Sequence, residues 1–117
     1  MKTSLLLATL CILSSCTTTE TKVQHVEIMT FRLTNPTLDQ DFATVNEEVN
    51  TFLKKQHGFI SRDLGKCNDS TWIDVLRWES VKHFEAAYTK SAEDQGVKKM
   101  SGMIDFNTVV PLSFNTY

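Results

Sequence analysis

Charged and aromatic side chains within otherwise apolar segments are the residues of this chain best suited to bind a ligand or do chemistry. Arg32 and Arg62 lie in such segments. Burying an unpaired cation is costly, so each must find a carboxylate, solvent or an anionic ligand. Asp74 is the candidate partner of Arg62, and the same run carries Trp72 and Trp78. The two indoles are either core residues or aromatic walls of a pocket, and both interpretations stay open.

The three histidines do not suggest a metal site. His25, His57 and His83 are far apart, and no pair has the spacing that metal ligands show. No glycine-rich loop precedes an expected helix, so we expect neither a metal nor another cofactor. His83, in the first turn of an expected helix, is either a surface residue or, if it faces a cavity, a general acid or base.

The first sixteen residues predict a leader that ends at a lipidated cysteine. The apolar run from Leu5 to Leu13 follows Lys2, and it is much shorter than the ~20 residues that span a bilayer but typical of a secretory leader. The exit Leu13-Ser14-Ser15-Cys16 resembles the bacterial lipobox. That resemblance implies cleavage before Cys16 and acylation of its thiol and new amine, and several acyl chains anchor a protein stably. The alternative is an ordinary cleaved leader with an incidental cysteine.

We therefore expect a signal peptide over residues 1–15, a lipidated tether over 16–23 and one domain over 24–117. Thr17, where inner-membrane lipoproteins usually have Asp, suggests the outer membrane of a bacterial cell envelope, with the domain facing the periplasm. The mature chain has eleven basic and fourteen acidic residues, a net charge of −3. This balance gives no basic patch for a nucleic acid. Cys67 is the remaining thiol, and its role stays open.

The segment 24–33 predicts a central strand, because apolar residues occur on both of its faces. A helix follows, with Thr37 and Gln40 at the spacing of a capping box. Its apolar residues recur at steps of four and three, and Gly58 is expected at the C′ position that ends it. The stripe consists of Leu38, Phe42, Val45, Val49 and Phe52.

Two strand-like runs, 58–66 and 71–79, flank a turn at Asn68-Asp69-Ser70 and predict a hairpin. With the turn centred near Asp69, Arg62 and Asp74 form a diagonal pair on one face, and Asp63 and Arg77 form another on the opposite face. The first face then also carries Ile60, Leu64, Trp72, Leu76 and Trp78.

Ser80 is a suitable N-cap for a second helix, whose expected apolar stripe is Val81, Phe84 and Tyr88. The helix should end near 94–96, and the segment 97–103 is expected to be a connector or a single helical turn. Strict alternation from 104 to 114 predicts a last strand. Pro111 within it favours an edge strand or a bulge, because proline donates no ladder hydrogen bond.

The order βαββαβ is the split βαβ pattern of an α+β ferredoxin-like sandwich with a four-stranded antiparallel sheet. Two helices cover only one face of such a sheet, yet large apolar residues are expected on both. Exposed apolar patches of this size usually mark an interface. We therefore predict a homodimer packed sheet to sheet, a dimeric α/β barrel.

Phe31-Arg32-Leu33, "GFISRDL", and "WIDVLRWES" leading into "FEAA" resemble the antibiotic-biosynthesis-monooxygenase-like family of dimeric α/β barrels. The likeness covers roughly Val26 to Phe114. Haem-degrading members have a Trp in the second helix and a His after it. The corresponding places here fall near Ala87 and Val97, which argues against haem cleavage. Fold alone does not settle activity in this family.

Three hypotheses follow. The first is a membrane-anchored module that binds a small apolar or aromatic molecule. The second is a cofactor-independent monooxygenase-like enzyme acting on a phenolic or quinone-like substrate, and the third is a non-catalytic interaction protein. The candidate site residues for the first two are Arg32, Arg62, Trp72, Asp74, Trp78 and His83, with Cys16 as the lipidation site.

Overall fold

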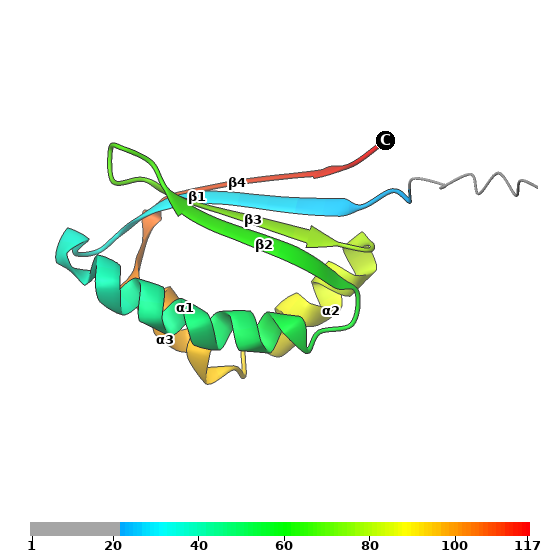
Figure 1. Ribbon diagram of the computed structural model, residues 1–117, viewed down its shortest axis with the longest axis horizontal. Helices are drawn as coiled ribbons and strands as arrows, with labels where there is room; N and C mark the ends of the chain where they lie inside the picture. Colours follow the sequence, from blue (N-terminus) through cyan, green and yellow to red (C-terminus); the bar gives the residue numbers. More distant parts are fainter. Residues whose placement is uncertain (1–21) are drawn as a thin grey trace, which may run out of the picture.

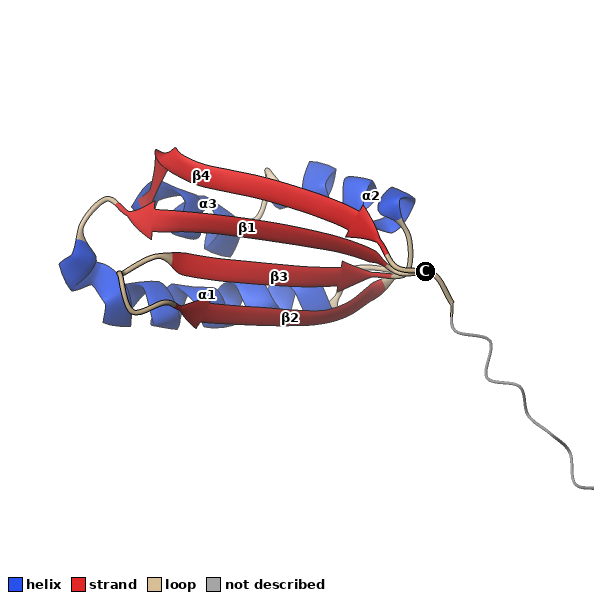
Figure 2. Cartoon of the chain, turned by 90° about the horizontal axis from the view of Figure 1, so that it is seen from above, coloured by secondary structure: helices blue, strands red, loops and turns tan. Residues whose placement is uncertain are grey.

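A computed structural model describes residues 22–117 of the chain. Four strands form one antiparallel sheet in the order β2-β3-β1-β4, and all the helices of this part of the chain cover the same face of the sheet (Figures 1 and 2). The expected α+β ferredoxin-like fold is confirmed. The elements are β1 (His25–Leu33), the 3-10 turn η1 (Pro36–Leu38), α1 (Asp39–Lys54), β2 (Phe59–Lys66), β3 (Trp72–Trp78), α2 (Val81–Ser91), α3 (Gln95–Met103) and β4 (Ile104–Asn115).

The strand β1 lies in the middle of the sheet, as its two apolar faces predict. It pairs with β3 on one side and β4 on the other. Its odd-numbered residues face the helices, and Phe31 is almost fully buried there. On the helix-free face, Val26 is fully buried as well.

The helix α1 begins differently from the expected capping box at Thr37. Asn35 caps the preceding 3-10 turn by accepting a hydrogen bond from the Thr37 backbone N–H, and α1 starts at Asp39. The buried face of α1 consists of Phe42, Asn46, Val49 and Leu53. The helix ends at Lys54, so Gly58, with a φ of 79°, lies in the following turn and not at the C′ position.

The β2–β3 hairpin contains a bulge that the expected register lacks. Phe59 pairs with Trp78 and Ser61 with Arg77, so Ile60 is the extra residue on β2. Phe59 therefore takes the place that was expected for Ile60 beside Trp78, and Ile60 is 41% exposed. Beyond the bulge, Arg62 pairs with Leu76, and the Arg62–Asp74 diagonal forms as predicted.

The second diagonal also has the predicted register, because Asp63 lies opposite Val75 and Arg77 is the next residue on that face of β3. Within residues 22–117, however, Asp63 and Arg77 form no ion pair.

The helix α2 is capped by Ser80 as predicted, through a hydrogen bond from the His83 backbone N–H. Its buried residue is Ala87, however, while Val81 is 41% and Tyr88 70% exposed. The helix is therefore rotated relative to the expected Val81–Phe84–Tyr88 stripe.

A third helix, α3, occupies the segment that was expected to be a connector. Asp94 caps it by accepting a hydrogen bond from the Val97 backbone N–H. Because α3 packs beside α1, beneath the β1–β4 side of the sheet (Figure 2), the helical layer is wider than the two-helix layer that the sequence predicted.

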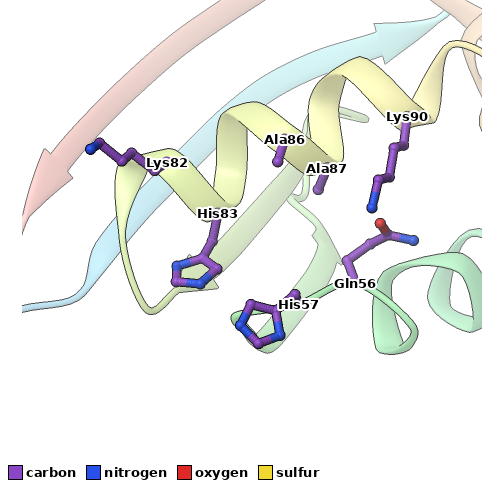
Figure 3. A pocket seen from close by; sticks show the side chains of 7 residues that line it. All are labelled: Gln56, His57, Lys82, His83, Ala86, Ala87 and Lys90. Carbon is purple, nitrogen blue, oxygen red and sulfur yellow. The ribbon is translucent and has the colours of Figure 1, made fainter.

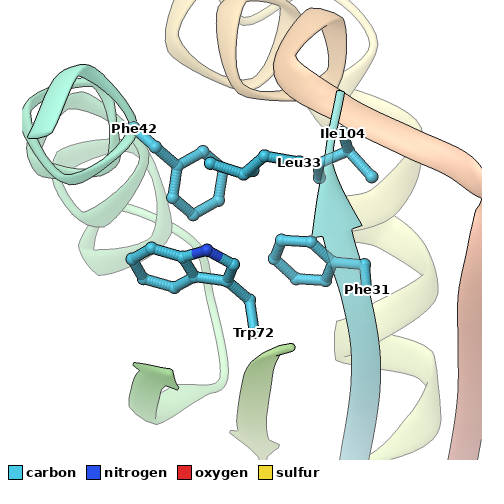
Figure 4. Close-up of a cluster of buried hydrophobic side chains, with 5 residues drawn as sticks. All are labelled: Phe31, Leu33, Phe42, Trp72 and Ile104. Carbon is cyan, nitrogen blue, oxygen red and sulfur yellow. The ribbon is translucent and has the colours of Figure 1, made fainter. Parts of the chain in front are cut away.

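Two hydrophobic clusters lie between the sheet and the helices. In the first, the ring of Phe42 packs edge-on against Trp72, with centroids 4.8 Å apart (Figure 4). The second lies toward the other end of the sheet and joins β3, α1 and α2 through Trp78, Val49, Leu53 and Ala87. The full first cluster is Phe31, Leu33, Phe42, Trp72 and Ile104.

The strand β4 is an edge strand, as Pro111 predicted, and its pairing with β1 is irregular between Thr30 and Arg32. On the helix-free face of the sheet, Val110, Leu112 and Phe114 are 62%, 62% and 45% exposed.

Candidate functional site

A cavity of about 780 Å³ lies on the helix-covered side of the sheet, bounded by residues of all four strands and the three α-helices. Its volume falls within the usual range of small-molecule sites, about 300–1,000 Å³. Apolar side chains supply most of its wall. They include Met29, Leu76, Trp78, Phe84 and Met100.

A buried ion pair forms part of this wall. The Arg62 and Asp74 side chains are 4% and 7% exposed. Arg62 Nε donates to Asp74 Oδ1 at 2.9 Å, and Nη2 donates to Oδ2 at 2.7 Å. This two-point geometry is the strong form of an arginine–carboxylate pair.

The remaining donors of Arg62 are also largely used. Nη2 donates to Asn46 Oδ1 at 2.7 Å, and Nη1 donates to Asn50 Oδ1 at 3.0 Å. Both asparagines lie on α1, one turn apart, so this helix holds the guanidinium through two hydrogen bonds. With its charge cancelled by Asp74, Arg62 is a structural element of the wall and is poorly suited to capturing an anion.

Trp78 is a buried aromatic residue of the cavity wall. The residue is 1% exposed and lines the cavity. Its ring packs edge-on against Phe59 and Phe84, at centroid distances of 5.4 Å and 6.2 Å. Its Nε1–H is buried and has no hydrogen-bond partner within residues 22–117. An unsatisfied buried donor of this kind costs about 1–3 kcal/mol.

Three of the predicted site residues lie away from the cavity, and Trp72 and Arg32 are two of them. Trp72 is a member of the first hydrophobic cluster (Figure 4). Arg32 was expected to be mostly buried, but its side chain is 50% exposed and pairs at 3.4 Å with Asp69 in the hairpin turn.

His83 lies outside the cavity, beside a separate shallow pocket of about 160 Å³ (Figure 3). Its Nδ1 is 2.7 Å from Ser80 Oγ, and its ring lies 5.0 Å from that of His57. Lys82 and Lys90 also line this pocket. The candidate residues that the structure does bring together at the cavity are Arg62, Asp74 and Trp78.

Sequence reasoning missed two polar residues at the cavity end of β1. His25 is 6% exposed, and its Nε2 lies 2.8 Å from Glu27 Oε1. Its Nδ1 lies 2.8 Å from Asn115 Oδ1 on β4. Glu27 itself lines the cavity. Their i, i+2 spacing in a predicted strand places them on one face, and that signal was available in the sequence.

The pKa of His25 is raised above its ordinary value. Burial of the ring opposes protonation, but the hydrogen bonds with Asn115 and Glu27 and the charges of Glu27 and Glu85 outweigh it. Within residues 22–117 there is no group of three or more potential metal ligands, and Cys67 is an exposed free thiol. Cys16 lies outside the described residues.

Comparison with known proteins identifies the fold. No protein-family model and no curated protein sequence matches the chain. Solved structures do match. SnoaB, a cofactor-independent oxygenase from Streptomyces nogalater, superposes with a TM-score of 0.67 at 15% identity, over 80% of this chain and 93% of that one.

Two further structures show the same likeness. The ActVA-Orf6 monooxygenase of Streptomyces coelicolor, solved with nanaomycin D, gives a TM-score of 0.63 at 16% identity, over 84% of this chain and 91% of that one. A Bordetella bronchiseptica protein assigned to the antibiotic biosynthesis monooxygenases gives 0.66 at 15% identity, over 80% and 97%. The chain therefore has the fold of antibiotic-biosynthesis-monooxygenase-like proteins.

Proposed function

We propose that this protein binds a small, neutral, predominantly aromatic molecule in the cavity between its sheet and its helices. The observation that carries the proposal is the cavity of about 780 Å³, whose wall is mostly apolar. Its buried charges are compensated, because Arg62 is paired with Asp74 and His25 with Glu27. The buried part of the site therefore offers a charged ligand no net opposite charge. The aromatic rings of Trp78 and Phe84 in the wall favour a planar aromatic ligand, such as a phenol or a quinone.

Two matched substitutions test the proposal. Ala92 lines the cavity and is exposed, whereas Ala43 on α1 is exposed and does not line it. Calorimetric titration with 1,4-naphthoquinone and 1,4-dihydroxynaphthalene should show binding to the unmodified protein and to Ala43→Phe. Ala92→Phe should weaken binding by tenfold or more, because the new ring occupies the edge of the cavity. Absence of binding by the unmodified protein, or equal binding by both variants, would reject the proposal.

A second candidate function, cofactor-independent oxygenation of a phenolic or quinol-like ligand, is supported by the fold shared with SnoaB and the ActVA-Orf6 enzyme. Such a reaction needs a base near the ligand, since a phenolate gives up an electron to O₂ more readily than a phenol does. Oxygen uptake with 1,4-dihydroxynaphthalene would test this function. Trp78→Ala should abolish uptake, while His83→Ala, which changes a residue outside the cavity, should not. Uptake no faster than in buffer alone would reject the activity and leave binding as the function.

We also propose that the protein is held at the bacterial cell envelope by acyl chains on Cys16, facing the periplasm. The support is the Leu13–Cys16 sequence and its resemblance to the lipobox. No helix within residues 22–117 is long and apolar enough to cross a bilayer. In cell fractionation, the full chain should sediment with membranes and Cys16→Ser should be released. An unchanged distribution would contradict the anchor.

We propose further that two copies pair through the helix-free face of the sheet. This surface is apolar along β4, where Val110 and Leu112 are each 62% exposed. Their cross-strand neighbours on β1 are Thr30 and Ile28. Sedimentation of the acyl-free domain should give a dimer at micromolar concentration, and Leu112→Lys should give a monomer. A monomeric unmodified domain would contradict the pairing.

A further inference from the structure

The His25–Glu27 pair of β1 has a fixed proton arrangement that follows from its hydrogen bonds. The oxygen of an asparagine side chain is only an acceptor, so Nδ1 of His25 must donate its proton to Asn115. The other ring nitrogen, Nε2, lies 2.8 Å from Glu27 Oε1. A hydrogen bond there requires one more proton between the two groups. The pair therefore consists of an imidazolium and a carboxylate that share this proton.

One carboxylate oxygen of Glu27 remains available. Oε1 is occupied by His25, whereas Oε2 has no hydrogen-bond partner within residues 22–117. The side chain is 22% exposed and lines the cavity. Of the carboxylates at the cavity, Asp74 accepts hydrogen bonds from Arg62 through both of its oxygens. Glu27 is thus the carboxylate of the cavity that has an oxygen free to meet a ligand.

We propose that Glu27 is the proton acceptor of this cavity for a neutral phenolic ligand, and that His25 is the residue that positions and polarises it. This inference rests on the proposed binding function. In the transfer, the O–H bond of the phenol breaks, its electron pair stays on the phenolate oxygen, and the proton forms a new O–H bond at Glu27 Oε2. His25 keeps both of its protons.

The transfer conserves the net charge of His25, Glu27 and the ligand taken together. Before it, the imidazolium charge is cancelled by Glu27. After it, Glu27 is neutral, and the cation of His25 is compensated by the new phenolate across the cavity wall, so the site never acquires a net charge. Glu85 of α2 also faces His25 and helps to keep it protonated, while Phe84 packs against its ring at 5.7 Å.

The test uses a coloured phenol, 4-nitrophenol, whose ionisation is read from its visible absorption while calorimetry follows its binding. Bound to the unmodified protein, the probe should ionise at least one pH unit below its value in buffer, which is about a tenfold gain in phenolate at a given pH. Glu27→Gln should abolish this shift while the neutral probe still binds at low pH. His25→Gln should reduce it. The control Glu85→Gln should keep most of it, because Glu85 is exposed and does not line the cavity.

The outcomes separate the two proposals. If neither 4-nitrophenol nor the naphthalene probes bind at any pH, the proposed function fails and takes this inference with it. If the probe binds but ionises as in buffer, or shifts equally in Glu27→Gln, this inference alone is overturned.

A measurement on the unliganded protein guards against misfolding of the variants. Titration of the His25 ring by NMR should show a raised pKa that falls in Glu27→Gln. A ring that titrates alike in both proteins would also overturn the inference, because the pair would then not share a proton.

Discussion

Removing one partner of the Arg62–Asp74 pair should destabilise the fold more than any exposed ion pair of this protein could. Arg62→Met would leave the carboxylate of Asp74, 7% exposed, without its cation, and Asp74→Leu would leave the guanidinium, 4% exposed, without its anion. Breaking a buried pair in this way typically costs about 3–5 kcal/mol. Since domains of this size have only about 5–15 kcal/mol of stability, either loss would be large in urea unfolding.

The double substitution Arg62→Met with Asp74→Leu should be much less harmful than either single change. Apolar residues of similar size often replace a buried ion pair without loss. The remaining penalty comes from Asn46, which is 3% exposed and would lose the Arg62 donor to its Oδ1. An unsatisfied buried acceptor costs about 1–3 kcal/mol. The double variant should therefore lose roughly that much, far less than the sum of the two single losses.

The control is the exposed pair Lys99–Glu48, whose side chains are 55% and 50% exposed. Lys99→Met should change the free energy of unfolding by no more than about 1 kcal/mol. If Arg62→Met and Asp74→Leu cost as little as this control, or if their effects simply add in the double variant, the description of the cavity wall as a buried, mutually compensated pair is refuted.

Two further predictions concern the backbone and the pH dependence. Gly58→Ala should lower the free energy of unfolding by more than about 1 kcal/mol, because φ at Gly58 is 79° and the added Cβ would clash with the ring of His83. Gly102→Ala, whose Cβ would enter open space on α3, should raise the free energy of unfolding by up to about 1 kcal/mol. Equal melting temperatures for the two variants would contradict this prediction. The raised pKa of His25 means that the folded state binds its proton more tightly than the unfolded state. This contribution to stability is complete below the ordinary pKa of 6.5 and is lost as the pH rises through the raised pKa of the folded state. The urea midpoint should therefore fall more steeply with pH in the unmodified protein than in Glu27→Gln. Parallel plots of the midpoint against pH for the two proteins would contradict this prediction.

The sequence was sufficient for the fold because its strongest signals are local and periodic. Alternation on β1 and β4, the Ser80 cap and the Asn68–Ser70 turn each correspond to an element that the structure contains. The Arg62–Asp74 pair was also predictable, since a buried cation needs a carboxylate and the hairpin brings that one beside it.

What the sequence could not provide depends on long-range packing. The bulge at Ile60 shifts which residue lies beside Trp78, and no turn residue or proline marks it. The segment 95–103 is amphipathic but contains two glycines, which have a low helix propensity, so the sequence did not predict the helix α3. The rotation of α2 is decided by which side chain, Ala87 or Tyr88, fits against α1 and β3, and this depends on side-chain size at a contact between distant segments.

The site was predictable only in part for the same reason. Trp72 and Trp78 lie on the same face of one strand, yet only Trp78 borders the cavity, because Phe42 of α1 closes over Trp72. The role of His25 depends on its hydrogen bond with Asn115, which is ninety residues away in the sequence.

The most direct test of the central claim, a ligand cavity between sheet and helices, is the NMR of methionine methyl groups during titration with 1,4-naphthoquinone. Met29, Met100 and Met103 all pack against the first hydrophobic cluster, but of these three Met29 and Met100 line the cavity and Met103 does not. Shifts of Met29 and Met100 that saturate together, with Met103 nearly unmoved, are the predicted result. No shift at saturating ligand, or a response at Met103 alone, would contradict it.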